Sequence, residues 1–147
     1  MLYLEDLSPG QIFDSRSITL SAEEIKSFAG QYDPQPFHLD EATATDTFFG
    51  ALVASGWQTG AVTMRLLVES VPLAGGLIGM GGEVAWPAPV HPGDSLSVRT
   101  EVLEVRPSRS RPDIGQAVIR STTSTQAGQA VQIATMRVLA RRRPAQI

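Results

Sequence analysis

The sequence predicts an α+β fold in which one curved antiparallel sheet wraps around a long central helix. Three observations predict this fold class. Helical spacing of apolar residues is found in the first half of the chain and is most extended between Gly56 and Val71. The second half changes to an alternation of period two, which is typical of strands. An order in which helices come first and a run of long antiparallel strands follows is typical of α+β folds.

The N-terminal part predicts a strand followed by a short helix. Gln11 to Leu20 comes after a Ser8-Pro9-Gly10 turn and predicts the first strand. Ser21 and Glu24 have the spacing of a capping box, in which each side chain accepts a hydrogen bond from the other residue's backbone N–H. We therefore expect a helix that begins here and ends near Gly30. Its buried side should carry Ile25, Phe28 and Ala29.

Two prolines interrupt the next segment, from Tyr32 to Asp40. A proline removes a backbone donor and clashes with the preceding helical turn, so Pro34 and Pro36 exclude a continuous helix. We expect a shaped loop here, followed by one further helical turn between Glu41 and Asp46.

The segment from Gly56 to Val71 predicts the long central helix. It is apolar over most of its circumference, and such a helix is normally buried. Pro72 and the Gly75-Gly76 pair end it, and a glycine-rich stretch as far as Gly82 separates it from the period-two segments. The residues at helical spacing that we expect in the core are Trp57, Ala61, Met64, Val68 and Val71, widened by Leu66 and Leu67.

The remaining segments predict long strands. Apolar residues alternate with polar ones from Leu96 to Val102, and the alternation then changes phase at Leu103, which predicts a β-bulge. A polar loop from Arg106 to Asp113 follows. Two more long strands are predicted, Ile114 to Gln126 and Gln129 to Arg141, joined by a tight turn at Ala127-Gly128. Because such a sheet has exposed edges that a second copy can cover, we expect a homodimer or a higher homo-oligomer.

Composition excludes several classes of protein. The 147 residues suit one domain, so we expect residues 1–147 to form a single unit without a separate cofactor domain. Twelve basic and 15 acidic residues give a net charge of -3, which argues against a nucleic-acid partner. The absence of cysteine excludes disulfides, thiolate metal sites and a cysteine nucleophile, and we expect no metal. Without a signal-peptide pattern or a stretch of about 20 apolar residues, we expect a cytoplasmic protein with no membrane partner.

Asp33 and His38 are the first candidates for chemistry. They lie five residues apart in a segment stiffened by Pro34 and Pro36, so both side chains can be held toward one point. A carboxylate and an imidazole that meet at one water supply a base and an acid near neutral pH. Spacing alone also fits a surface loop in which the aspartate caps a helix and the histidine faces solvent.

Gly56, at the start of the central helix, is the second candidate. A helix N-terminus presents free backbone N–H groups and the positive end of the helix dipole, and a glycine lets a ligand oxygen approach closely. The Gly56 N–H is therefore suited to a thioester oxygen that becomes negative in the transition state. The alternative is that Ser55 simply caps the helix and that Gly56 allows close packing.

These features together resemble a known family. The segment from Tyr32 to about Leu67 is similar to the MaoC-like, R-specific enoyl-CoA hydratases, which have the hot-dog fold. Their Asp-x-Asn-Pro-x-His signature appears here as Asp33-Pro34-Gln35-Pro36-Phe37-His38, followed by a glycine at the head of the helix, Gly56. A later segment, Trp86 to Asp94, looks like the family's proline-glycine-aspartate turn. Two positions depart from the pattern: Gln35 replaces asparagine, and Met64, with Thr63 beside it, stands where family members can carry a serine.

The resemblance implies a single MaoC-like hot-dog domain that interconverts a trans-2-enoyl-CoA and an R-3-hydroxyacyl-CoA in fatty acid metabolism. It implies that Asp33 and His38 hold the attacking water, with Asp33 as the base, and that the Gly56 N–H stabilises the oxyanion. We expect substrate contacts from Gln35, Pro36, Ser55 and Trp57. Coenzyme A would enter as part of the acyl-CoA substrate, and no other cofactor is expected.

Two alternatives remain open at this point. A hot-dog thioesterase would share the fold, and such enzymes commonly use an acidic residue on or beside the central helix. Glu69 is the only one on this helix and lies near its far end. A non-catalytic acyl-CoA binding protein would keep the fold and bind the thioester without turning it over.

Overall fold

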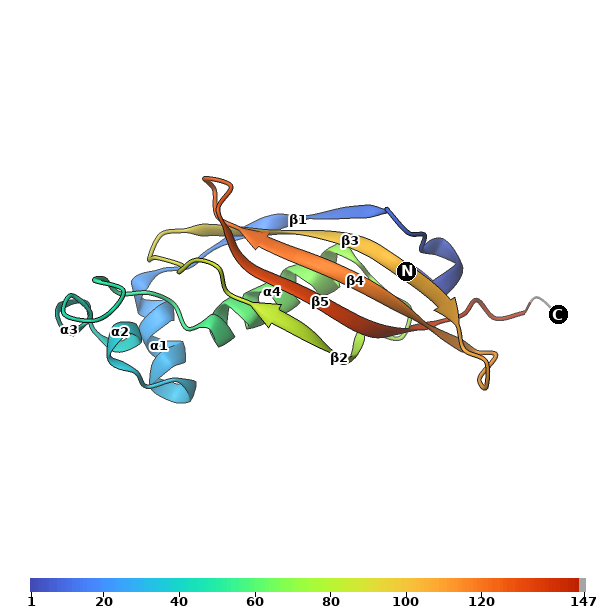
Figure 1. Cartoon of the computed structure of the whole chain (residues 1–147), viewed down its shortest axis with the longest axis horizontal. Helices are drawn as coiled ribbons and strands as arrows, with labels where there is room; N and C mark the ends of the chain where they lie inside the picture. Colours follow the sequence, from blue (N-terminus) through green and yellow to red (C-terminus); the bar gives the residue numbers. More distant parts are fainter. Residues whose placement is uncertain (146–147) are drawn as a thin grey trace.

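The computed structural model describes residues 1–145 and confirms the α+β class. A five-stranded antiparallel sheet, in the order β1-β3-β4-β5-β2, wraps around helix α4 (Figure 1). Helices α1 to α3 gather at one end of the molecule, and the N-terminus lies toward the other. The strands are β1 (Ile12–Thr19), β2 (Ile78–Ala85), β3 (Ser95–Pro107), β4 (Ile114–Ser124) and β5 (Ala130–Arg141). The helices are α1 (Ala22–Tyr32), α2 (Pro36–Leu39), α3 (Glu41–Ala44) and α4 (Gly56–Ser70), after the 3₁₀ turn η1 (Leu4–Asp6).

The predicted capping box begins α1. The Ser21 hydroxyl accepts from the Glu24 N–H at 3.1 Å, and the Glu24 carboxylate accepts from the Ser21 N–H. The helix continues two residues beyond the predicted end at Gly30 and stops at Tyr32. Gly30 has no positive φ that would break the helix, and the Asp33 N–H still donates to Ala29 O at 2.9 Å.

The proline-rich segment after α1 is a loop that contains one helical turn. Pro36 is the first residue of α2, where its missing N–H is not needed by the helix. The single turn predicted after Asp40 is α3, and Asp40 caps it by accepting from the Thr43 N–H at 2.9 Å. These short helices place His38 against the rest of the domain.

The sequence did not predict strand β2. Its glycines, Gly79, Gly81 and Gly82, obscure the alternation that marks the other strands. A Cβ on Gly82 would overlap the Thr135 carbonyl of β5, so this glycine permits close pairing at the sheet edge. The other strand features are confirmed: the register shifts between Val102 and Glu104, and the β4–β5 turn carries its positive φ at Gly128.

Helix α4 has the predicted length, but most of its predicted core face is wrong. Trp57, Met64 and Val68 are 65%, 45% and 40% exposed, and Ala61 is also exposed. The side that packs on the sheet instead carries Gln58, Thr59, Thr63, Leu66 and Leu67. Apolar residues lie on both sides of the helix, so their spacing alone could not tell which side meets the sheet.

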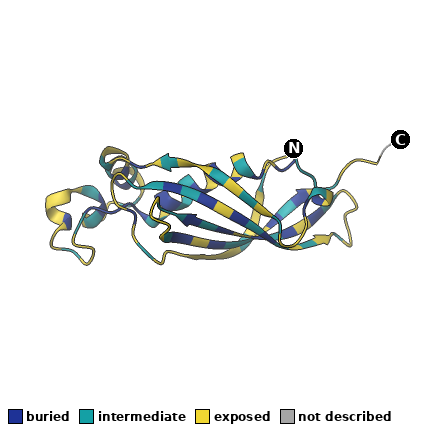
Figure 2. Ribbon diagram, turned by 90° about the horizontal axis from the view of Figure 1, so that it is seen from above, coloured by how far each residue is buried: buried dark blue, intermediate teal, exposed yellow. Residues whose placement is uncertain are grey.

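The core consists of two clusters, one toward each end of α4. One packs Leu67 and Val71 against β3, β4 and β5 and against η1. The other packs Ile25 of α1 against Ala44 of α3, Leu52 and Val90. Buried and exposed residues alternate along the strands (Figure 2), as expected for a sheet with one covered face. The second cluster anchors the loop that carries Asp33 and His38.

Candidate active site

Asp33 and His38 approach each other as the sequence predicts. Asp33 follows α1 as its C-cap, and His38 lies on α2 and is only 5% exposed. Asp33 Oδ2 lies 3.2 Å from His38 Nε2. The backbone between them is held by hydrogen bonds from the Gln35 N–H to Asp33 O and from the His38 N–H to Gln35 O.

A backbone carbonyl fixes which nitrogen of His38 carries hydrogen. His38 Nδ1 lies 2.7 Å from Val53 O, in a buried hydrogen bond. Because a carbonyl only accepts, Nδ1 must be protonated, and Nε2 therefore carries the lone pair in the neutral ring. This places a nitrogen that can accept a proton beside the Asp33 carboxylate.

The Asp33 carboxylate is held at both oxygens. Its Oδ2 accepts from the Ser55 hydroxyl at 2.7 Å, and its Oδ1 accepts from Gln35 Nε2 at 2.6 Å. Burial by itself raises the pKa of Asp33, but the hydrogen bonds from Ser55 and Gln35, together with the nearby His38, outweigh it. The net effect lowers the pKa of Asp33, so the group is a carboxylate at neutral pH.

The N-terminus of α4 lies beside this pair. Ser55 is its N-cap, and the hydroxyl accepts from the Trp57 N–H at 3.2 Å. Ser55 O accepts from the N–H groups of Gln58 and Thr59. The Gly56 N–H makes no hydrogen bond within residues 1–145, and it stands at the positive end of the helix. It is therefore available to a ligand oxygen.

Trp86 explains why position 56 is a glycine. A Cβ on Gly56 would lie 2.8 Å from Cε2 of the Trp86 indole, closer than side chains can pack. The indole is fixed by a hydrogen bond from its Nε1 to Gln132 Oε1 at 2.9 Å and by an edge contact with Trp57. The close packing at Gly56 that the sequence analysis offered as an alternative is therefore present. It does not exclude the other role, because the Gly56 N–H makes no hydrogen bond within residues 1–145.

A cavity of 480 Å³ opens onto these groups. Of the site residues expected from the sequence, Asp33, Gln35, His38, Gly56 and Trp57 line it. Pro36 lies outside it as the first residue of α2, and Ser55 is fully buried behind Asp33. The remaining wall, largely apolar, comes from Phe37, Phe48, Phe49, Ala54, Thr59, Trp86, Pro87, Ala88, Pro89, Val90 and Val131.

Sequence reasoning missed Gln132 and Thr59 as parts of the site region. Gln132 is 3% exposed and holds Trp86, and Thr59 lines the cavity one helical turn after Gly56. The sequence signal for Gln132 was weak, because other polar residues such as Thr135 and Arg137 lie on the same strand. Within residues 1–145, no three His, Asp or Glu side chains come together in a way that could hold a metal ion, and no helix is long and apolar enough to cross a membrane.

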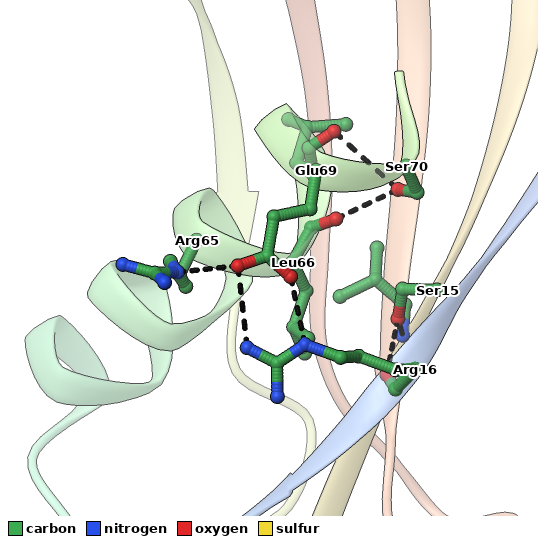
Figure 3. A network of polar contacts seen from close by, with 8 residues as sticks. Ser15, Arg16, Arg65, Leu66, Glu69 and Ser70 are labelled. Atoms are coloured by element: carbon green, nitrogen blue, oxygen red, sulfur yellow. Dashed lines mark hydrogen bonds and ion pairs between the residues drawn. The ribbon is translucent and has the colours of Figure 1, made fainter. Parts of the chain in front are cut away.

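Glu69, the acid on the central helix, occupies a different environment at the far end of α4. Figure 3 shows its carboxylate between Arg16 of β1 and Arg65 of α4. Hydrogen bonds from Arg16 and Arg65 lower the pKa of Glu69 to about 2. A carboxylate that is paired twice and is so weakly basic is poorly suited to proton abstraction, and it lies at the opposite end of the helix from Gly56.

Comparison with known proteins shows the fold and the family of the chain. A MaoC-like dehydratase from Rhodospirillum rubrum, known from a crystal structure, is 53% identical to this chain in sequence. The two structures superpose with a TM-score of 0.96, over 99% of this chain and 100% of that one. This likeness confirms the hot-dog fold. The chain is also 36% identical to the uncharacterised protein YdeM of Bacillus subtilis, over 73% of this chain and 77% of that protein.

A relative with a named activity is more distant. The chain is 32% identical to a 3-hydroxybutyryl-CoA dehydratase from Methylorubrum extorquens, over 76% of this chain and 70% of that protein. The family model described as "MaoC like domain" matches residues 6–126, which include every residue of the cavity except Val131. The chain therefore belongs to the MaoC-like dehydratase domain family.

Proposed function

We propose that the protein catalyses the reversible addition of water to a trans-2-enoyl-CoA, which gives an R-3-hydroxyacyl-CoA. One observation carries this proposal: an Asp33–His38 pair and the unpaired Gly56 N–H face the same cavity. Hydration needs both features, since a base must activate water while the thioester oxygen gains negative charge. Membership of a dehydratase family and the 3-hydroxybutyryl-CoA dehydratase among the relatives support it.

We propose that the attacking water binds at a free acceptor position of Asp33. A carboxylate offers about four acceptor positions. The Ser55 hydroxyl and His38 Nε2 occupy the surroundings of Oδ2, whereas Oδ1 accepts only from Gln35 within residues 1–145. Water held between Oδ1 and the His38 ring is therefore placed to lose a proton to Asp33.

The water oxygen then bonds to the β-carbon of the enoyl group, and the electron pair of the double bond moves toward the thioester. The oxygen of the resulting enolate accepts from the Gly56 N–H at the positive end of α4. The Asp33–His38 pair returns one proton to the α-carbon, which completes the addition and restores the site. Protons balance without any further group, so coenzyme A enters only as part of the substrate.

The cavity walls indicate how the acyl group is held. Trp57 and Trp86 meet edge to face at 5.1 Å, next to Gly56. We propose that Trp57 and Gln35 contact the substrate directly and that Pro36 contributes by fixing the loop. A volume of 480 Å³ lies in the usual range for small-molecule sites.

We further propose that the protein works in the cytoplasm as a homodimer. Met64 and Val68 on α4, and Met80 and Val84 on the edge strand β2, are exposed apolar side chains. A second copy could cover these side chains, and among the described residues the free edge of β2 could extend its sheet with that copy. Sedimentation should show a dimer, and Met64→Glu should weaken it. A monomer at every concentration would exclude this assembly.

The test of the proposed function is an assay with crotonyl-CoA. Loss of the conjugated thioester absorbance without release of free thiol would establish hydration, and Asp33→Asn and His38→Ala should each lower the rate by about 10²- to 10⁴-fold. The matched controls are Asp14→Asn and His91→Ala, exposed residues outside the cavity, which should keep wild-type rates.

Two other outcomes would refute the proposal. Thiol release would identify a thioesterase, for which the paired Glu69 offers no suitable base. Binding of crotonyl-CoA without any turnover, unchanged in Asp33→Asn, would identify a non-catalytic acyl-CoA binding protein.

A further inference from the structure

We infer that Ser55 is a positioning residue that ties the Asp33 carboxylate to the N-terminus of α4. This inference rests on the proposed hydratase function and deepens it. Ser55 is fully buried and does not line the cavity, so it meets no substrate. It acts through Asp33, whose Oδ2 it contacts at 2.7 Å.

The two hydrogen bonds of the Ser55 hydroxyl have a fixed direction. The Trp57 N–H can only donate, so the Ser55 oxygen accepts from it at 3.2 Å. The single hydroxyl hydrogen is then directed to Asp33 Oδ2, since a carboxylate only accepts. The hydroxyl therefore joins the first turn of the helix to the carboxylate with no freedom to reverse.

The first consequence concerns which oxygen of Asp33 reacts. Ser55 and His38 both face Oδ2, whereas Oδ1 is held only by Gln35 among the described residues. Without Ser55 the plane of the carboxylate could turn about χ2 and carry both oxygens away from this orientation. With Ser55, one oxygen is held by the serine, and the other is kept at the position proposed for the attacking water.

The second consequence concerns spacing within the site. Ser55 holds the base, and the next residue, Gly56, supplies the proposed oxyanion donor. One peptide unit therefore sets the distance between the group that activates water and the group that receives the thioester oxygen. A displacement of about 1 Å between such groups can cost on the order of 10²-fold in rate, so this link is expected to affect turnover.

A simpler role is that Ser55 caps α4 and nothing more. The two roles can be separated because glycine is nearly as good an N-cap as serine but has no hydroxyl. Ser55→Gly should keep the helix while releasing Asp33. Ser21→Ala is the matched control, since Ser21 caps α1 in the same way but contacts neither Asp33 nor the cavity.

The experiment measures kcat and KM for crotonyl-CoA against pH in the wild type, Ser55→Gly and Ser21→Ala. We expect Ser55→Gly to lower kcat by about 10- to 100-fold with little change in KM, because positioning of the base is lost. Its acid limb should move to higher pH, since removal of a donor raises the pKa of Asp33. Ser21→Ala should lower the urea midpoint and leave kcat and the acid limb unchanged.

A second readout does not depend on turnover. Carbon NMR of the Asp33 carboxyl group should show its titration moving to higher pH in Ser55→Gly and staying in place in Ser21→Ala. An unchanged Asp33 titration, or wild-type kcat in a folded Ser55→Gly variant, would overturn the role of Ser55. A wild type that leaves crotonyl-CoA unchanged would overturn the proposed function instead, while the titration still decides the role of Ser55.

Discussion

Replacing Gly56 with alanine tests the contact between α4 and Trp86. The added Cβ would lie 2.8 Å from Cε2 and 3.0 Å from Cδ2 of the indole. Both are ring atoms, and the ring is tied to Gln132, so the clash cannot be relieved by rotating the end of a flexible chain. Either Trp86 or the first turn of α4 must move.

The magnitude follows from two opposing terms. Alanine in place of glycine stabilises a helix by up to about 1 kcal/mol, because glycine loses more backbone freedom on folding. Overpacking a filled site costs about 1 to 3 kcal/mol. We therefore expect Gly56→Ala to lower the free energy of unfolding by up to about 3 kcal/mol.

Gly60 provides the control within the same helix. A Cβ there would meet only Gln132 Oε1 at 3.6 Å, an ordinary contact. Gly60→Ala should therefore raise the free energy of unfolding by about 0.5 to 1 kcal/mol. Comparing the two variants largely removes the helix-propensity term and leaves the overpacking term, about 1 to 3 kcal/mol.

Urea unfolding at one fixed protein concentration measures both variants, and the crotonyl-CoA assay follows activity. Because the Gly56 N–H must shift with its residue, we expect kcat to fall by about tenfold or more in Gly56→Ala and to stay near wild type in Gly60→Ala. If the two variants gained equal stability and kept equal activity, the proposed tight packing of Gly56 against the Trp86 indole would be refuted.

Two further predictions concern groups away from the cavity. Thr63 and Thr123 share a buried hydrogen bond of 2.6 Å, so Thr63→Val should cost about 1 to 3 kcal/mol by leaving a hydroxyl unpaired. In the Thr63→Val background, Thr123→Val should lower the free energy of unfolding by less than it does in the wild type. If the two effects measured by urea unfolding were strictly additive, they would contradict the hydrogen bond. Glu69 has its pKa lowered to about 2, below its unfolded value of about 4.3, so its pairing stabilises the fold above that value and is lost as pH falls toward 2. The stability difference between the wild type and Glu69→Gln should therefore vanish near pH 2, and a constant difference at all pH values would exclude this linkage.

The sequence predicted those parts of the fold that local rules determine. The capping box at Ser21 and the phase change at Leu103 each gave the correct element, because hydrogen bonding of neighbours and alternation of side chains are local. Strand β2 was not predicted because its glycines have no side chains and so give no alternation of apolar and polar residues. Its position is set by pairing with β5, which is distant in sequence.

The candidate site was predicted as a set of residues but not as a geometry. The Asp33–His38 pairing follows from a short stiff loop, so spacing was informative. The hydrogen bond from Ser55 to Asp33 spans 22 residues, and the one from Trp86 to Gln132 spans 46. No local pattern records such contacts, since they arise only when α4 and β5 are brought together by the core.

The side of α4 that was predicted to be buried, and is instead exposed, bears on the proposed dimer. Ala61, Met64 and Val68 recur at the spacing of a buried helix face, yet they are exposed. The sheet side holds three polar residues, Gln58, Thr59 and Thr63, which a helix selected only to fill its own core would not need. A helix with two covered sides would have this pattern if the sheet packed on one side and a second copy on the other. The same second copy would account for the apolar side chains on β2, so the failed prediction and the exposed edge strand both support the proposed dimer.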